Sequence, residues 1–207
     1  MSEEKFLERL KEYLTNRYNK KDIIEKRGGP YEPYIGRNPQ FKSPEETELK
    51  WYVRRSGEYP GVYEDADGKV FVLSPPAGDF YDVFPLESEL KKFFRRWRRR
   101  HHRYEKFDME LEFHRMMVDR RRWKEIEEDK DFKWMIDSFR EKEEIAKKVS
   151  EKTGFKVVYY IPPPGGGNRF YFYTCFDSKG MGDEEKMKMI ERAIDAVEEA
   201  YGLWRTW

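Results

Sequence analysis

One run of the sequence concentrates side chains that can bind phosphate. Between positions 90 and 104 stand eight cations and no acid, with a single tryptophan, Trp97, among them. The cations are Lys91, Lys92, Arg95, Arg96, Arg98, Arg99, Arg100 and Arg103. Arginine outnumbers lysine, and its planar guanidinium makes paired hydrogen bonds to phosphate and stacks on bases.

On a helix, these cations occupy every side except the stripe that holds Phe93 and Trp97. Such a surface repels itself unless an anion lies on it, so the run predicts a polyanionic partner. A solvated helix face is the alternative interpretation, and both stay open because charge runs commonly have only that role. The formal net charge is +1, so binding must come from local segregation of charge.

The helix that carries this run belongs to a long segment, from Leu90 to Val149, without Gly or Pro. Apolar residues recur every seven positions through most of it, which favours a helix packed on its own protein. An unbroken helix would be about 90 Å long. We therefore predict two antiparallel helices, about 86–127 and about 131–150. The polar run 127–131 separates them, and Asp129 or Asp131 can cap the second.

Helices are also predicted on both sides of this segment. Ser2 can cap a first helix that ends near Tyr18, and a second helical turn is expected at 21–26. The strongest local helix signal is Ser43-Pro44-Glu45-Glu46, which predicts a helix to about Arg55. A last helix is expected from Asp183 to Gly202.

Two β-hairpins complete the expected elements. The first pairs 62–65 with 69–73 around Asp67-Gly68, and the second pairs 155–161 with 169–176 around a Pro/Gly loop. The predicted fold class is α+β, mainly helical, with a long central basic helix, a helical pair and two short antiparallel hairpins. Its segments are 1–84, 85–153 and 154–207, in one or two compact domains.

The second hairpin offers another candidate surface, the aromatic run that begins at Arg169. Strand alternation places either Phe170 and Phe172 or Tyr171 and Tyr173 on the core side. Outward tyrosines beside Arg169 can stack on single-stranded bases. Packing of these rings against the tyrosines at 159 and 160 is the favoured interpretation.

Catalytic and metal chemistry find little support in the sequence. Asp67 and Lys69, with Glu64 and Asp65 just before them, faintly suggest the site of a metal-dependent nuclease. An Asp-Gly pair is far more often simply part of a hairpin turn. The adjacent His101 and His102 point about 100° apart on a helix, and His114 stands alone. The glycines at 165–167 lack the rest of a phosphate loop. Cys175 is the single cysteine, which excludes an internal disulfide and a cysteine-based zinc site. With none of these motifs complete, no catalytic residue, metal or cofactor is predicted.

The leading functional hypothesis is a non-enzymatic nucleic-acid-binding protein that contacts the phosphate backbone, from a virus or mobile element of a thermophile. The rival is a structural or assembly protein, a homo-oligomer whose interfaces are an aromatic arm at 30–41 and the tail 203–207. A metal-dependent nuclease ranks last. No membrane segment is expected, and an intracellular location, in the host cytoplasm or a virion, is predicted.

Overall fold

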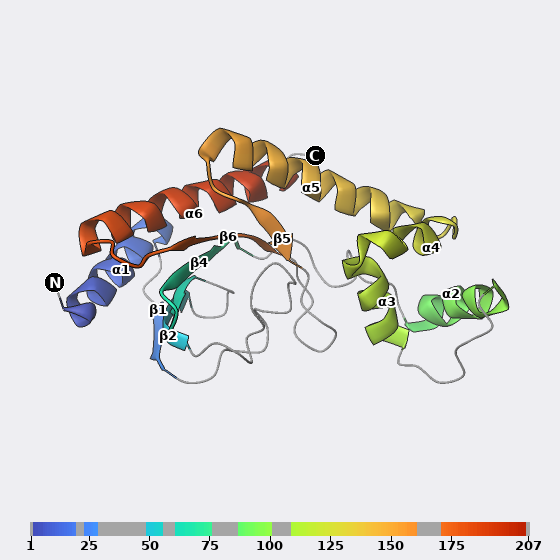
Figure 1. The fold of residues 1–207 in the computed structure, drawn as a ribbon, viewed down its shortest axis with the longest axis horizontal. Helices are drawn as coiled ribbons and strands as arrows, with labels where there is room; N and C mark the ends of the chain where they lie inside the picture. The colour runs from blue at the N-terminus through green and yellow to red at the C-terminus, as the bar shows by residue number, and fades with distance from the viewer. Residues whose placement is uncertain are drawn as a thin grey trace.

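The computed structural model describes residues 2–19, 23–28, 49–55, 61–75, 87–100, 109–160 and 171–205. One antiparallel sheet lies beneath a layer of helices, and further helices extend from one end (Figure 1). The elements are α1 (Glu3–Tyr18), β1 (Ile23–Arg27), β2 (Leu49–Arg55), β3 (Val62–Asp65), β4 (Lys69–Leu73), α2 (Glu87–Arg100), α3 (Met109–Val118), the 3-10 helix η3 (Arg120–Arg122), α4 (Trp123–Glu127), α5 (Lys133–Thr153), β5 (Val158–Tyr160), β6 (Tyr171–Asp177) and α6 (Asp183–Arg205). The predicted α+β class is confirmed.

The sheet has six strands in the order β1-β2-β3-β4-β6-β5, and every neighbouring pair is antiparallel. Both predicted hairpins form, as β3 with β4 and β5 with β6. Pairing of β4 with β6, from Lys69 opposite Asp177 to Leu73 opposite Tyr173, joins them into one sheet. The expectation of two separate hairpins therefore missed a pairing between strands about a hundred residues apart.

Two of the predicted helices are wrong. Residues 23–27 and 49–55 are strands, whereas 20–22 and 43–48 lie outside the described residues. In β2, Trp51 and Val53 alternate toward the helical layer and are fully buried. Burial of these two side chains at a spacing of two outweighs the local capping signal, because tertiary packing routinely overrides propensity.

The main core lies between the sheet and the helical layer. Val70 and Val72 point into it from β4, whereas Phe71 and Leu73 point to the opposite face of the sheet, as strand alternation requires. The first helix begins as predicted, because the Ser2 hydroxyl accepts a hydrogen bond from the Lys5 N–H (3.5 Å). The buried side chains of the two helices that cover this face are Phe6, Leu7, Leu10 and Leu14 of α1 and Met187, Ile190, Ala193, Ile194, Ala196, Val197 and Ala200 of α6.

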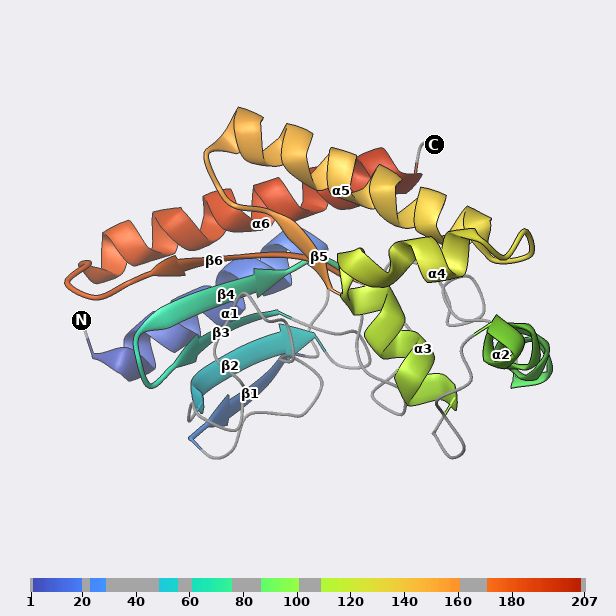
Figure 2. The same ribbon diagram turned by 45° about the vertical axis from the view of Figure 1, so that its right-hand side comes forward.

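The expected helix over 86–127 is divided into α2, α3, η3 and α4, with residues 101–108 outside the described part. The predicted break at 127–131 is present, since α4 ends at Glu127 and α5 begins at Lys133. Helix α5 then reaches from α4 to the sheet, where it packs on α6 and β5. Figure 2 shows α2 and α3 at the end of the molecule away from β6 and the start of α6.

The last helix is longer than predicted. It continues through Gly202 to Arg205, and Leu203 and Trp204 pack, partly buried, against the main core. Trp207 and the predicted aromatic arm at 30–41 lie outside the described residues. None of the described helices combines the length and the apolar character that crossing a bilayer requires.

Candidate nucleic-acid interface

Helix α2 is held by an apolar stripe along one side. Leu90, Phe93, Phe94 and Trp97 are all buried there. The ring of Phe93 lies edge-on to Phe113 of α3, with ring centroids 5.4 Å apart. Because large aromatic rings bury extensive area, this stripe is sufficient to fix which side of α2 faces outward.

Trp97 anchors the helix and is not a stacking residue. Its side chain is only 4% exposed, and its indole N–H donates to Glu125 Oε2 of α4 (2.9 Å). An indole buried in this way anchors α2 and is not available for stacking on a base. Trp97 therefore contributes to a nucleic-acid interface only by positioning α2.

Arg96 is also engaged within the protein. Its guanidinium donates from Nε and Nη2 to the two carboxylate oxygens of Asp129 (2.7 and 2.9 Å), and Nη2 lies 3.1 Å from Asp131 Oδ2. Asp129 is buried, so this pair is a structural bridge between α2 and the turn after α4. The repulsion that the sequence predicted is thus relieved inside the molecule at this position.

The other described cations of α2 remain at the surface. Lys91 forms an exposed pair with Glu87 one turn earlier (2.5 Å). Lys92 and Arg95 are exposed and form no ion pair with the described part of the chain. At about 100° per residue, positions 92, 95 and 99 lie directly opposite the buried stripe.

The remaining predicted binding residues are outside what the structure describes. Arg98, Arg99 and Arg100 continue α2, but their side chains are not described, and Arg103 and Arg169 lie outside the described residues. The structure therefore brings Lys91, Lys92, Arg95, Arg96 and Trp97 together on one helix, and it divides them into two surface lysines, one surface arginine and two anchors.

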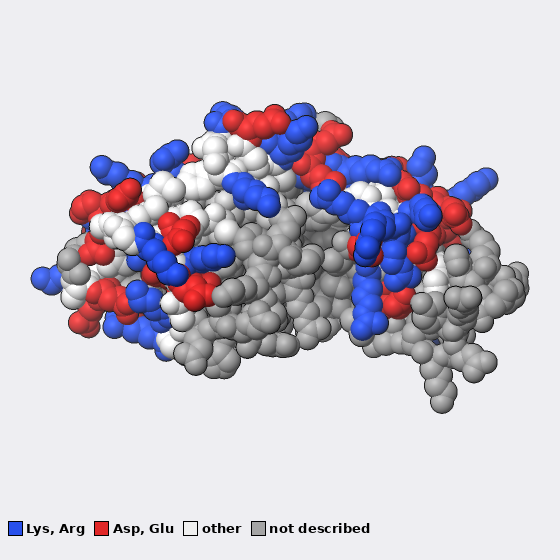
Figure 3. Space-filling view, in the orientation of Figure 1, with Lys and Arg blue, Asp and Glu red and all other residues white. Residues whose placement is uncertain are grey.

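A second group of cations, absent from the sequence-based set, lies at the end of α3 and in η3. Arg115, Arg120 and Arg121 have side chains that are 64%, 67% and 88% exposed. Figure 3 shows Lys and Arg side chains gathered over the α3–α4 end of the molecule, with acids beside them. Three consecutive arginines after Asp119 mark this group in the sequence, but they form a shorter cationic run than that at 91–103.

These exposed arginines form ion pairs with carboxylates that differ in exposure. Arg121 pairs with Asp119 through Nε and Nη2 (both 2.8 Å), Arg120 with Glu143 (2.5 Å), and Arg115 lies 3.7 Å from Glu112. The pKa of Asp119 is lowered by its hydrogen bond from Arg121. An exposed pair contributes about 0–1 kcal/mol, so a phosphate can replace the carboxylate at the Arg121–Asp119 pair with little loss. Glu112, by contrast, is buried.

Arg122 differs from its two neighbours because it links elements. It donates to Glu112 of α3 (2.8 Å) and to Glu125 of α4 (3.0 Å), the residue that also holds Trp97. Partial burial lowers the pKa of Arg122, but its bonds to Glu125 and Glu112 outweigh that effect and raise the pKa above its ordinary value. Arg122 is therefore a structural residue, like Arg96.

The hairpin residues considered for nuclease chemistry do not converge. Glu64 is 3% exposed on the helix-covered side and accepts from Lys186 Nζ (3.0 and 3.1 Å). Asp65 follows it on the opposite side of β3, where it accepts from the Lys69 N–H (2.9 Å), and burial raises its pKa. Throughout the described ranges, no three His, Cys, Asp or Glu side chains gather as a metal site. His101 and His102 lie outside these ranges.

The aromatic strand β6 packs inside the protein. Phe172 faces the main core opposite Tyr159, and Tyr171 and Tyr173 face the other side of the sheet, where both are buried. Tyr171 pairs across the strands with Tyr160, as the favoured packing interpretation predicted. Buried tyrosines cannot stack on bases, so this strand offers no second binding surface.

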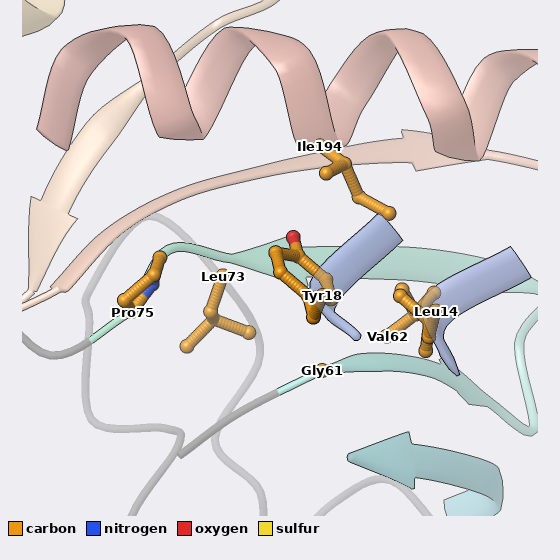
Figure 4. Close-up of a pocket in the computed structure, with 7 residues that line it drawn as sticks. All are labelled: Leu14, Tyr18, Gly61, Val62, Leu73, Pro75 and Ile194. Atoms are coloured by element: carbon orange, nitrogen blue, oxygen red, sulfur yellow. The ribbon is translucent and has the colours of Figure 1, made fainter. Parts of the chain in front are cut away.

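A small apolar pocket lies between the helical layer and the sheet (Figure 4). Leu14 and Tyr18 of α1, Val62 and Leu73 of the sheet and Ile194 of α6 line it. Its volume of about 20 Å³ gives room for about one water molecule. A pocket of this size is too small for a cofactor.

Comparison with known proteins gives no family assignment. No protein-family model, no curated protein and no solved structure matches this chain. Functional inference therefore depends on the residues and their geometry.

Proposed function

We propose that the protein binds nucleic acid through its phosphate backbone, using the exposed cations of the arginine-rich region. This region is defined as residues 87–132, of which 87–100 and 109–132 are described, and it holds ten of the twenty arginines in less than a quarter of the chain. The observation that carries the proposal is the pair Lys92 and Arg95. Both project from α2 opposite its buried stripe, with no ion pair in the described part of the chain.

The exposed arginines beyond α2 support the same proposal. Arg115, Arg120 and Arg121 are at least 64% exposed. Glu112 and Asp119, the partners of Arg115 and Arg121, lie in the same region, whereas Glu143, the partner of Arg120, lies on α5. Binding to phosphates releases condensed counterions from nucleic acid, which an exposed intramolecular pair does not. The net charge of +1 means that this binding is local and strongly dependent on salt.

An assembly role is the second candidate, and the structure gives it less support. Leu203 and Trp204, proposed as interface residues of the tail, pack against the protein's own core. The aromatic arm at 30–41 lies outside the described residues. A nuclease role has no convergent carboxylates among the described side chains.

The test is a salt titration of binding to double-stranded DNA, single-stranded DNA and RNA in parallel. Binding that weakens steeply with salt supports the proposal, because each phosphate contact contributes about 0.7–0.9 to the slope of log affinity against log salt. Lys92→Gln with Arg95→Gln should reduce that slope by about two. Absence of binding at low salt, or binding insensitive to salt, contradicts the proposal.

A matched control uses two exposed lysines outside the arginine-rich region. Lys147 lies on α5 and Lys188 on α6, and both are exposed. The double variant Lys147→Gln, Lys188→Gln removes the same charge from the protein and should leave the salt slope unchanged. If both double variants lower the slope equally, binding depends on total charge and not on α2.

A further inference from the structure

Trp134, in the first turn of α5, is the one large apolar side chain of the described residues that is exposed, at 50%. The two tryptophans of the arginine-rich region, Trp97 and Trp123, are buried. An exposed indole is an energetic cost in the free protein that a ligand can remove.

A hydrogen bond to the backbone orients this indole. Its Nε1 donates to the backbone carbonyl of Asp131 (2.9 Å). Since the N–H already has a partner, the surface left for a ligand is the aromatic ring and not a hydrogen-bond donor. A ligand that recognises Trp134 must therefore contact a flat π-face, and a fixed ring loses little conformational freedom on binding.

The same residue, Asp131, connects Trp134 to α2. The Asp131 carboxylate lies 3.1 Å from Arg96 Nη2, so the indole is attached to the turn that holds α2 in place. Lys130 and Lys133 lie on either side of Asp131, are exposed, and form no ion pair with other described residues. The exposed acids nearby in the sequence are Glu128, Asp131 and Asp137, and Asp137 lies 3.5 Å from Arg140.

We propose that Trp134 stacks on an unpaired nucleobase while Lys130 and Lys133 contact the adjoining phosphates, so that the nucleic acid bound is single-stranded. This inference rests on the proposed function and specifies its substrate class. An aromatic face on the same turn as two exposed lysines suits a single strand, because its bases are free to stack and its phosphates run alongside. Duplex bases are already stacked on each other and offer no free face to a surface indole.

The test compares Trp134→Ala with Trp134→Phe, using fluorescence anisotropy of a labelled oligothymidylate and of a labelled DNA hairpin duplex. Trp134→Ala should weaken binding to the single strand about tenfold and leave duplex binding almost unchanged. Trp134→Phe keeps a stacking ring and should stay within about threefold of the native chain. Neither variant removes a cation, so the salt slope should not change.

A second variant separates charge from stacking. Lys130→Gln with Lys133→Gln should lower the salt slope for the single strand by about 1.5, whereas the stacking variant leaves it as it is. Intrinsic fluorescence gives a direct readout, because quenching by the oligothymidylate should be smaller in Trp134→Phe than in the native chain. Thermal unfolding of each variant checks that the fold is intact.

The outcomes distinguish this inference from the proposed function. Suppose that the native chain binds nucleic acid with salt dependence, but that Trp134→Ala keeps full affinity for the single strand or loses the same affinity for both ligands. The stacking role is then wrong and the proposed function stands. If Trp134→Ala changes only the oligomeric state in light scattering, the indole contacts protein and the inference fails. If the native chain binds none of these ligands at low salt, both proposals fail.

Discussion

In the sheet body, made of α1, the six strands, α6 and the adjoining part of α5, a charged pair such as Glu64 with Lys186 is almost fully enclosed. In the arginine-rich region, a buried carboxylate pairs with a partly exposed guanidinium group, as Asp129 does with Arg96. The body is stabilised by aliphatic and aromatic packing along a continuous sheet, whereas the region combines a small phenylalanine cluster with arginine bridges.

This difference shows that arginine has two roles in one segment. Arg96 and Arg122 hold short helices together, and Arg95 and Arg121, close to them in sequence, remain at the surface. Counting cations in the sequence cannot separate these roles. Exposure and the partner's burial can, since a buried carboxylate requires its partner and an exposed one does not.

The largest expected effect concerns the phenylalanine cluster. Phe93 contacts Phe113 and Phe132 and is 1% exposed. Phe93→Ala should lower the free energy of unfolding by about 3–5 kcal/mol, because it leaves a cavity among rings that cannot close over it. Urea denaturation measures this loss. If the arginine-rich region then unfolds in a separate transition at lower urea, the two parts of the molecule differ in stability as well as in composition. A loss below about 1 kcal/mol would contradict the role of the phenylalanine cluster in holding the region together.

A buried lysine of α5 gives the next effect. Lys142 of α5 is 4% exposed and donates from Nζ to the Ser138 carbonyl (3.1 Å) and hydroxyl. Burial lowers its pKa from 10.5 to about 8, so the folded chain releases this proton at a lower pH than the unfolded chain does. Between about pH 8 and 10.5 the unfolded state binds more protons, and stability must rise with pH.

Lys142→Met should therefore be more stable than the native chain at pH 7, by up to about 3 kcal/mol, and this advantage should vanish near pH 10.5. Urea denaturation of both chains at several pH values measures the difference, in which the titration of all other groups cancels. A difference that does not change with pH would show that Lys142 is not buried in its charged form.

The smallest effects compare two aspartates that each hold an arginine. Asp129→Asn removes the buried partner of Arg96 and should cost about 1–3 kcal/mol. Asp119→Asn removes the partner of the 88% exposed Arg121 and should cost at most about 1 kcal/mol. Thermal or urea denaturation of the two variants gives both values. Equal losses would remove the distinction between bridging and surface arginines.

Local signals in the sequence were sufficient for several elements. The Ser2 cap, the Asp67-Gly68 hairpin, the strand pair around the Pro/Gly loop and the start of the last helix at Asp183 all follow from neighbouring residues. The strand β2 could not be predicted in this way. The capping signal at 43–46 is local and indicates a helix, whereas the pairing with β1 and β3 that stabilises the strand involves residues distant in sequence.

The sequence by itself determined that the chain is α+β, that α2 has an apolar stripe, and that cations are concentrated beside it, because residue type and spacing encode periodicity and charge. Only the tertiary structure decided which cations are at the surface. Arg96 meets Asp129 across 33 residues and Trp97 meets Glu125 across 28. Contacts of that separation depend on where the chain returns in space, and no local spacing specifies it.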